Sequence, residues 1–115
     1  MEKVAAFKMG SSDVSLLKFC LKDLFEVLLP GSEAELTELI KSRKVRAVVI
    51  DVGRLGSGGI QTVENVKGMG RIPVIAITAY LDSSNKYSVF RAGADYYLLK
   101  PYSKRDIQRI LKQFI

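Results

Sequence analysis

The sequence contains no histidine and one cysteine among its 115 residues. The lack of histidine excludes imidazole-based zinc sites, Ser-His-Asp or Cys-His catalysis, and an imidazole proton shuttle. A single cysteine cannot form an internal disulfide, and Cys20 falls on the apolar face of a predicted helix, where we expect a buried thiol. No apolar run approaches the ~20 residues that a membrane span needs, and the N-terminus lacks a signal-peptide pattern. These absences indicate a cytoplasmic protein.

Basic residues outnumber acidic ones, and the net charge is +6. The first 64 residues are neutral overall, with nine basic and nine acidic residues, whereas residues 65–115 carry nine basic and three acidic residues. A basic half fits either an acidic or nucleic-acid partner or a solvated surface without a binding role. No helix-turn-helix, zinc-finger or RNA-binding motif is present, so direct nucleic-acid binding is not expected. The length suits a single domain over residues 1–115.

Short apolar runs alternate with segments of helical periodicity along the whole chain. Strands are predicted at residues 4–7, 25–29, 47–50, 72–77 and 96–99, and helices at 13–24, 32–44, 60–69, 83–92 and 103–114. We expect Asp13, Ser103, and either Ser83 or Ser84 to act as helix caps. Continuous apolar strands separated by helices predict a parallel sheet that is covered on both faces.

Polar residues directly follow three of the predicted strands: Asp51, Thr78 and Lys100. Ligands and chemistry collect at the carboxyl ends of parallel strands. A carboxylate there could attack a phosphoryl donor, while an ammonium and a hydroxyl bind the phosphoryl oxygens. The alternative is an ion pair at the sheet edge with the threonine as a turn cap. Three such residues at successive strand ends favour the phosphoryl site.

Three stretches of the sequence resemble the receiver domain of two-component response regulators. They are Ala47-Val48-Val49-Ile50-Asp51, Pro73-Val74-Ile75-Ala76-Ile77-Thr78-Ala79, and Gly93-Ala94-Asp95-Tyr96-Tyr97-Leu98-Leu99-Lys100-Pro101. The resemblance covers almost the full chain and implies an α/β, flavodoxin-like (βα)5 three-layer sandwich with parallel strand order 2-1-3-4-5. It also implies a signalling module rather than an enzyme, with a sensor histidine kinase or another signalling protein as its partner.

The resemblance assigns a role to each matching site residue. It makes Asp51 the phosphoacceptor, Thr78 the switch hydroxyl and Lys100 the phosphoryl-binding lysine, followed by a cis bond to Pro101. It makes Tyr97 the aromatic that turns inward on activation. The family signals, or forms homodimers, through the face made by the helix near 83–92, the strand at 96–99 and the last helix.

The sequence departs from the family where a pair of acids should follow the first strand and hold Mg²⁺. That region reads Phe7-Lys8-Met9-Gly10-Ser11 and contains no acid. With Asp51 as the sole carboxylate and the Gly53 backbone carbonyl as a second ligand, any Mg²⁺ site should be weak and phosphoryl transfer slow. Lys8 either points toward Asp51 as a substitute for the metal or extends into solvent. The family usually has Met-Pro where this chain has Arg54-Leu55.

Two functional hypotheses therefore stand beside phosphorylation on Asp51. The first is a pseudo-receiver, which uses the same fold as a phosphorylation-independent protein-interaction module. The second is a small nucleotide-binding enzyme, supported by the glycine-rich loop at residues 53–59. That loop matches neither G-x-G-x-x-G nor the phosphate-binding G-x-x-x-x-G-K-[ST] pattern, which argues against the enzyme.

Overall fold

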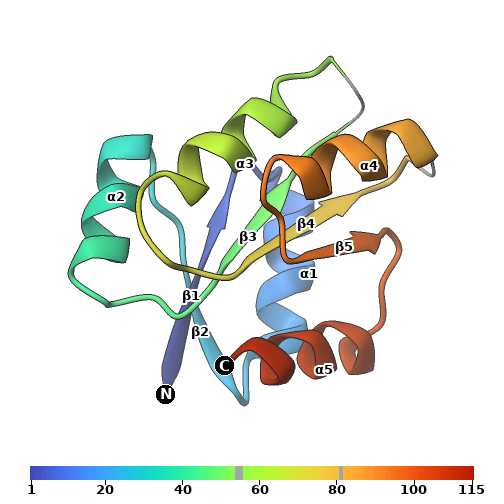
Figure 1. The fold of residues 1–115 in the computed structure, drawn as a ribbon. Coiled ribbons are helices and arrows are strands. Elements are labelled where there is room, and N and C mark those ends of the chain that lie inside the picture. The colour runs from blue at the N-terminus through green and yellow to red at the C-terminus, as the bar shows by residue number, and fades with distance from the viewer. Residues whose placement is uncertain (54–55, 81) are drawn as a thin grey trace.

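The computed structural model describes residues 1–53, 56–80 and 82–115, so the departure at Arg54-Leu55 lies outside the described residues. Strands and helices alternate along the chain (Figure 1). The strands are β1 (Glu2–Phe7), β2 (Phe25–Leu28), β3 (Val48–Asp51), β4 (Val74–Thr78) and β5 (Tyr96–Leu99). The helices are α1 (Ser11–Leu21), α2 (Glu33–Lys41), α3 (Gly59–Lys67), α4 (Ser83–Arg91) and α5 (Lys104–Phe114).

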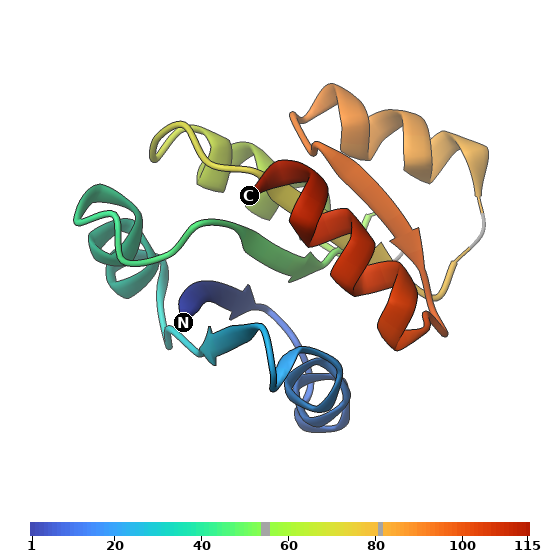
Figure 2. The same cartoon turned by 90° about the horizontal axis from the view of Figure 1, so that it is seen from below.

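The strands form one parallel sheet in the order β2-β1-β3-β4-β5. Helices α1 and α5 cover one face of this sheet, and α2, α3 and α4 cover the other (Figure 2). The flavodoxin-like (βα)5 fold with strand order 2-1-3-4-5 is thereby confirmed.

The hydrophobic core consists of two layers because successive strand residues face opposite sides of the sheet. In β3, Val48 and Ile50 pack beneath α2 and α3, whereas Val49 packs beneath α1 and α5. All three side chains are fully buried, as expected for a central strand of a parallel sheet. Cys20 lies in the α1–α5 layer and is buried, which confirms the sequence prediction. Burial raises the pKa of its thiol, and the nearby Lys104 ammonium only partly opposes this shift.

Helix caps set where the helices begin, and two of the predicted caps are wrong. Ser103 does cap α5, in a reciprocal capping box with Asp106. Helix α4 is instead capped by Asp82, whose carboxylate accepts hydrogen bonds from the first-turn N–H groups. Helix α1 begins at Ser11, two residues earlier than predicted, so Asp13 lies within its first turn and does not act as the cap. Its carboxylate is therefore available for contacts outside the helix.

Among the described residues, no helix combines the length and the apolar character that crossing a bilayer requires.

Candidate functional site

The carboxyl edge of the sheet brings Asp51 and Lys100 into direct contact. The Lys100 Nζ lies 2.8 Å from Asp51 Oδ2, and the Gly53 N–H donates to Asp51 Oδ1 at 2.9 Å. Both oxygens of the carboxylate are thus engaged, and the side chain keeps only 18% of its surface exposed. The Lys100–Pro101 bond that follows β5 is cis, as the resemblance implies.

A second carboxylate, from Asp13, shares the same ammonium. The Asp13 Oδ2 lies 3.1 Å from Lys100 Nζ. The prediction that Asp51 is the sole carboxylate of the site is therefore wrong. Burial alone would lower the pKa of Lys100, but hydrogen bonds and charge attraction from the two carboxylates outweigh burial and raise this pKa. One signal could have identified Asp13: it is the only acid between Glu2 and Asp23.

Thr78 also lies at this edge but does not contact Asp51 directly. Its fully buried hydroxyl donates to the Gly53 carbonyl at 2.7 Å and accepts from the Tyr80 N–H at 3.1 Å. Because Gly53 also donates its N–H to Asp51, this one residue connects the carboxylate and the hydroxyl. The structure thus brings Asp51 and Lys100 into contact, whereas Thr78 is connected to Asp51 through Gly53.

A buried polar network extends from Gly53 to β5 through Asn85. The Asn85 amide donates to the Gly53 carbonyl at 3.4 Å and to the Tyr97 hydroxyl at 3.2 Å. The Tyr97 hydroxyl in turn donates to the Tyr80 carbonyl at 2.9 Å. Sequence reasoning missed Asn85, although it precedes Val89 by four residues and so lies on the buried stripe of α4. A polar residue on a buried stripe needs partners, and here they are the β3–α3 loop and β5.

Lys8 lines a cleft of about 390 Å³ that opens beside Asp51, with Ser57, Gly58 and Thr62 on its other walls. Its ammonium lies 5.5 Å from the centre of the Phe7 ring and forms no ion pair with any described residue. The cation paired with Asp51 is therefore Lys100. The backbone of Lys8 has a φ of 58°, an uncommon conformation for a residue other than glycine.

A resident Mg²⁺ ion would need carboxylate and water oxygens as ligands. Both Asp51 oxygens accept hydrogen bonds, and the Gly53 carbonyl accepts from Thr78 and Asn85. Within residues 1–53, 56–80 and 82–115, no three acidic, cysteine or histidine side chains gather closely enough to hold a metal ion. Lys8 adds positive charge to the same cleft. In this arrangement the residues do not fit a resident Mg²⁺ ion.

Comparison with solved structures gives the same fold at low sequence identity. A response regulator from Thermotoga maritima superposes with a TM-score of 0.83 at 23% identity, covering 100% of this chain and 98% of that one. The receiver domain of a sensor histidine kinase from Pseudomonas aeruginosa, with a magnesium ion coordinated in its active-site cleft, superposes with a TM-score of 0.79 at 20% identity. That match covers 98% of this chain and 96% of the other.

Curated sequences include relatives that are similar to most of this chain. The transcriptional regulatory protein SrrA of Staphylococcus aureus is 29% identical over 93 residues. The match covers 80% of this chain but only 39% of that regulator, so the chain spans well under half the length of this relative. The sequence profile of the response regulator receiver domain matches residues 12–112. The chain therefore belongs to the response regulator receiver domain family.

Proposed function

We propose that this receiver domain accepts a phosphoryl group on Asp51. The observation that carries the proposal is the 2.8 Å contact between the Asp51 carboxylate and the Lys100 ammonium, next to an open cleft. An Asp51 oxygen would attack the phosphorus of a phosphohistidine or a small phosphoramidate. The phosphorus–nitrogen bond would break, and the nitrogen would leave with its electron pair and take a proton from solvent. The product is an acyl phosphate on Asp51.

Lys100 and Thr78 would bind the new phosphoryl oxygens. The raised pKa of Lys100 keeps its ammonium charged at neutral pH, so it can stabilise the negative charge that arrives with the phosphoryl group. Thr78 would have to exchange the Gly53 carbonyl for a phosphoryl oxygen, since its hydroxyl has one proton to donate. Lys8, on the wall of the cleft, would add a second positive charge in the place where relatives have acids.

Phosphorylation would change the surface formed by α4, β5 and α5 through the Asn85 network. When Thr78 releases the Gly53 carbonyl, the Asn85 amide becomes the remaining side-chain donor to that carbonyl. A shift of Asn85 toward Gly53 would alter its bond to Tyr97 and so the position of Tyr97 on β5. This surface would then bind a signalling protein or form a homodimer. A sensor histidine kinase is the expected phosphoryl donor.

Divalent ions would accelerate this reaction less than in receivers that retain the acid pair. Asp51, Asp13 and the Gly53 carbonyl would be the available ligands, and all three already accept hydrogen bonds. We therefore expect acyl phosphate formation to be slow and to depend weakly on Mg²⁺.

The test is incubation with phosphoramidate over a series of Mg²⁺ concentrations that includes none, followed by intact-mass measurement. We expect the mass of one phosphoryl group to be added, with the yield changing little across the series. Asp51→Asn should abolish the adduct, while the control Asp13→Asn should retain it because Asp13 contacts Lys100 and not the phosphorylated atom.

Absence of an adduct at every Mg²⁺ concentration would reject the proposal. The domain would then be a pseudo-receiver that binds its partner without phosphorylation. An adduct that persists in Asp51→Asn would also reject it, since the acceptor would be another residue.

A further inference from the structure

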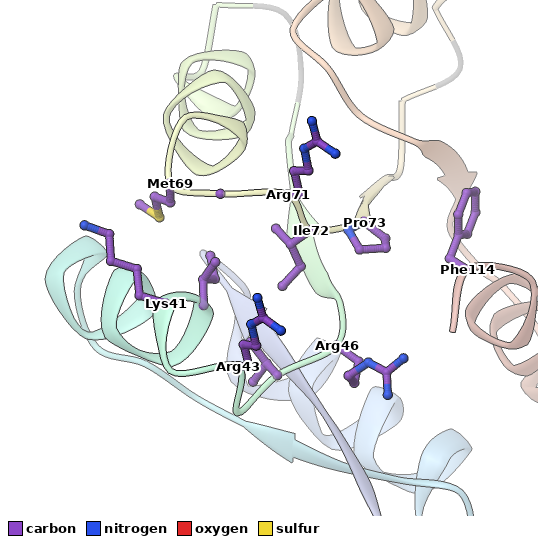
Figure 3. Close-up of a pocket in the computed structure, with 11 residues that line it drawn as sticks. Lys41, Arg43, Arg46, Met69, Arg71, Ile72, Pro73 and Phe114 are labelled. Carbon is purple, nitrogen blue, oxygen red and sulfur yellow. The ribbon is translucent and has the colours of Figure 1, made fainter.

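A second cleft, of about 810 Å³, lies at the amino ends of β3 and β4, at the opposite edge of the sheet from Asp51 (Figure 3). We call it the basal cleft. Its basic residues are Lys41, Arg43, Arg46 and Arg71, and its aliphatic floor consists of Ile40, Val45, Met69 and Ile72. These residues come from the end of α2, the segment before β3 and the segment between α3 and β4. In Figure 3 the side chains of Lys41, Arg43 and Arg71 stand around Ile72.

The cations of the basal cleft are largely uncompensated. Lys41, Arg43 and Arg71 form no ion pair with any described residue, and no acid lines the cleft. Arg46 pairs with Glu2 at 3.0 Å, but both side chains are about half exposed, so this pair is weak. Unpaired cations around one concave surface favour the binding of an anion.

Positive charge continues beyond the basal cleft. A neighbouring depression shares Arg43 and Arg46 with it and adds Lys3 and Lys44, together with Glu2, which is paired with Arg46. The cations therefore form an extended strip, which suits an extended partner with several negative charges better than a single phosphate. Most of these cations belong to the first half of the sequence, whose net charge is zero, so the net charge of that half does not indicate the strip.

Arg43 occupies a backbone position that normally favours glycine. Its φ is 60°, and it follows the end of α2, where its N–H donates to the Ile40 carbonyl and the Lys44 N–H donates to the Leu39 carbonyl. This pattern is a Schellman motif, in which the left-handed residue is usually glycine because other residues are strained there. An arginine at this position places a guanidinium beside the cleft at a conformational cost, which points to a role for the side chain.

We propose that the basal cleft binds an acidic segment of a partner protein that also carries aliphatic side chains. Carboxylates would pair with Arg43 and Arg71, since guanidinium groups bind carboxylates in a bidentate manner. Aliphatic side chains of the segment would cover the floor around Val45, Met69 and Ile72. Single-stranded nucleic acid fits less well because it stacks its bases on aromatic side chains, and among the described residues only Phe114 supplies an aromatic ring to the cleft.

The probe is a short fluorescent peptide rich in glutamate and leucine, measured by anisotropy at physiological salt. Replacing both Arg43→Gly and Arg71→Gln should weaken its binding about tenfold, as expected for the loss of two partly exposed charge pairs. The matched control is Lys104→Gln with Arg105→Gln, which removes two exposed cations from the first turn of α5, at the opposite end of that helix from Phe114. That control should change the affinity by less than about twofold, because screening limits the effect of distant charges. The Arg43→Gly change should not lower the melting temperature, since glycine relieves the strained φ.

Three outcomes would overturn the proposal. The first is no detectable binding of the acidic peptide. The second is a lack of charge specificity, seen as equal weakening by the α5 control or as equal binding of a peptide with glutamine in place of glutamate. The third is binding of single-stranded DNA that is tighter than binding of the acidic peptide and is abolished in the Arg43→Gly, Arg71→Gln variant. The cleft would then be a nucleic-acid site. Amide chemical shifts that change at residues 41–46 and 69–72, and not around Asp51, would support the proposal.

Discussion

Replacing Lys100 with methionine should destabilise the protein substantially, because it leaves two carboxylates without their shared cation. Asp51 and Asp13 lie 2.8 and 3.1 Å from the ammonium. The three side chains are 18–28% exposed, which places them between a buried and a surface ion pair. Breaking a buried pair costs roughly 3–5 kcal/mol, and a surface pair contributes roughly 0–1 kcal/mol. We expect Lys100→Met to lower the free energy of unfolding by about 2 kcal/mol at neutral pH.

The pH dependence of this loss follows from the charges involved. The pKa of Lys100 is raised above its ordinary value of 10.5, so its stabilising contribution is fully present at neutral pH and is lost as the pH rises through the folded-state pKa. Deprotonated Lys100 carries no charge and no longer pairs with the two carboxylates. The difference in unfolding free energy between Lys100→Met and the wild type should therefore narrow as the pH rises above 10.5.

Urea denaturation at neutral and alkaline pH measures these differences directly. Lys104→Met is the matched control, because Lys104 pairs with Asp23 at 3.9 Å and both side chains are largely exposed. Its free energy of unfolding should change by less than about 1 kcal/mol. Equal destabilisation by Lys100→Met and Lys104→Met would refute the view that Lys100 organises the site.

Three further predictions concern stability. Burial, together with nearby negative charge, raises the pKa of Tyr102 to about 12. The unfolded chain therefore loses this proton first, and the free energy of unfolding should fall as the pH rises above about 10. If the melting temperature of Tyr102→Phe falls with alkaline pH as steeply as that of the wild type, this prediction is contradicted. Replacing Asn85 with alanine removes two buried hydrogen bonds and should cost about 1–2 kcal/mol, measured by urea denaturation. Gly59→Ala would press a Cβ against the Val52 backbone and should cost about 1–3 kcal/mol, whereas Gly10→Ala meets open space and should cost less than about 1 kcal/mol, through the poorer N-cap of α1.

The fold could be predicted from the sequence because each strand is a short, continuous apolar run bounded by polar or glycine residues. Val48-Val49-Ile50 illustrates this, since a run buried on both faces is typical of a parallel sheet. The boundaries were less certain, because several polar residues near a helix start can all act as caps. At α4, Asp82, Ser83 and Ser84 are adjacent. The cap is the residue whose backbone is extended, which is Asp82.

The strand-end residues of the site could also be predicted, since strand order alone brings Asp51 and Lys100 to one edge. Asp13 stands out in the sequence as an isolated acid, but its contact with Lys100 joins residues 87 positions apart and depends on where α1 begins, so the sequence does not show that it reaches the site. Asn85 was missed for a similar reason. Its partners lie on the β3–α3 loop and on β5. Helical periodicity identifies a buried position on α4 but does not identify the residues that contact it.

The most direct test of the account is to locate the acyl phosphate on the chain. Borohydride reduces a phosphorylated aspartate to homoserine, so treatment after phosphoramidate marks the acceptor for peptide mass spectrometry. We predict homoserine at Asp51 and unmodified aspartate at Asp13, although both carboxylates contact Lys100. Homoserine at Asp13, or at neither residue, would contradict it.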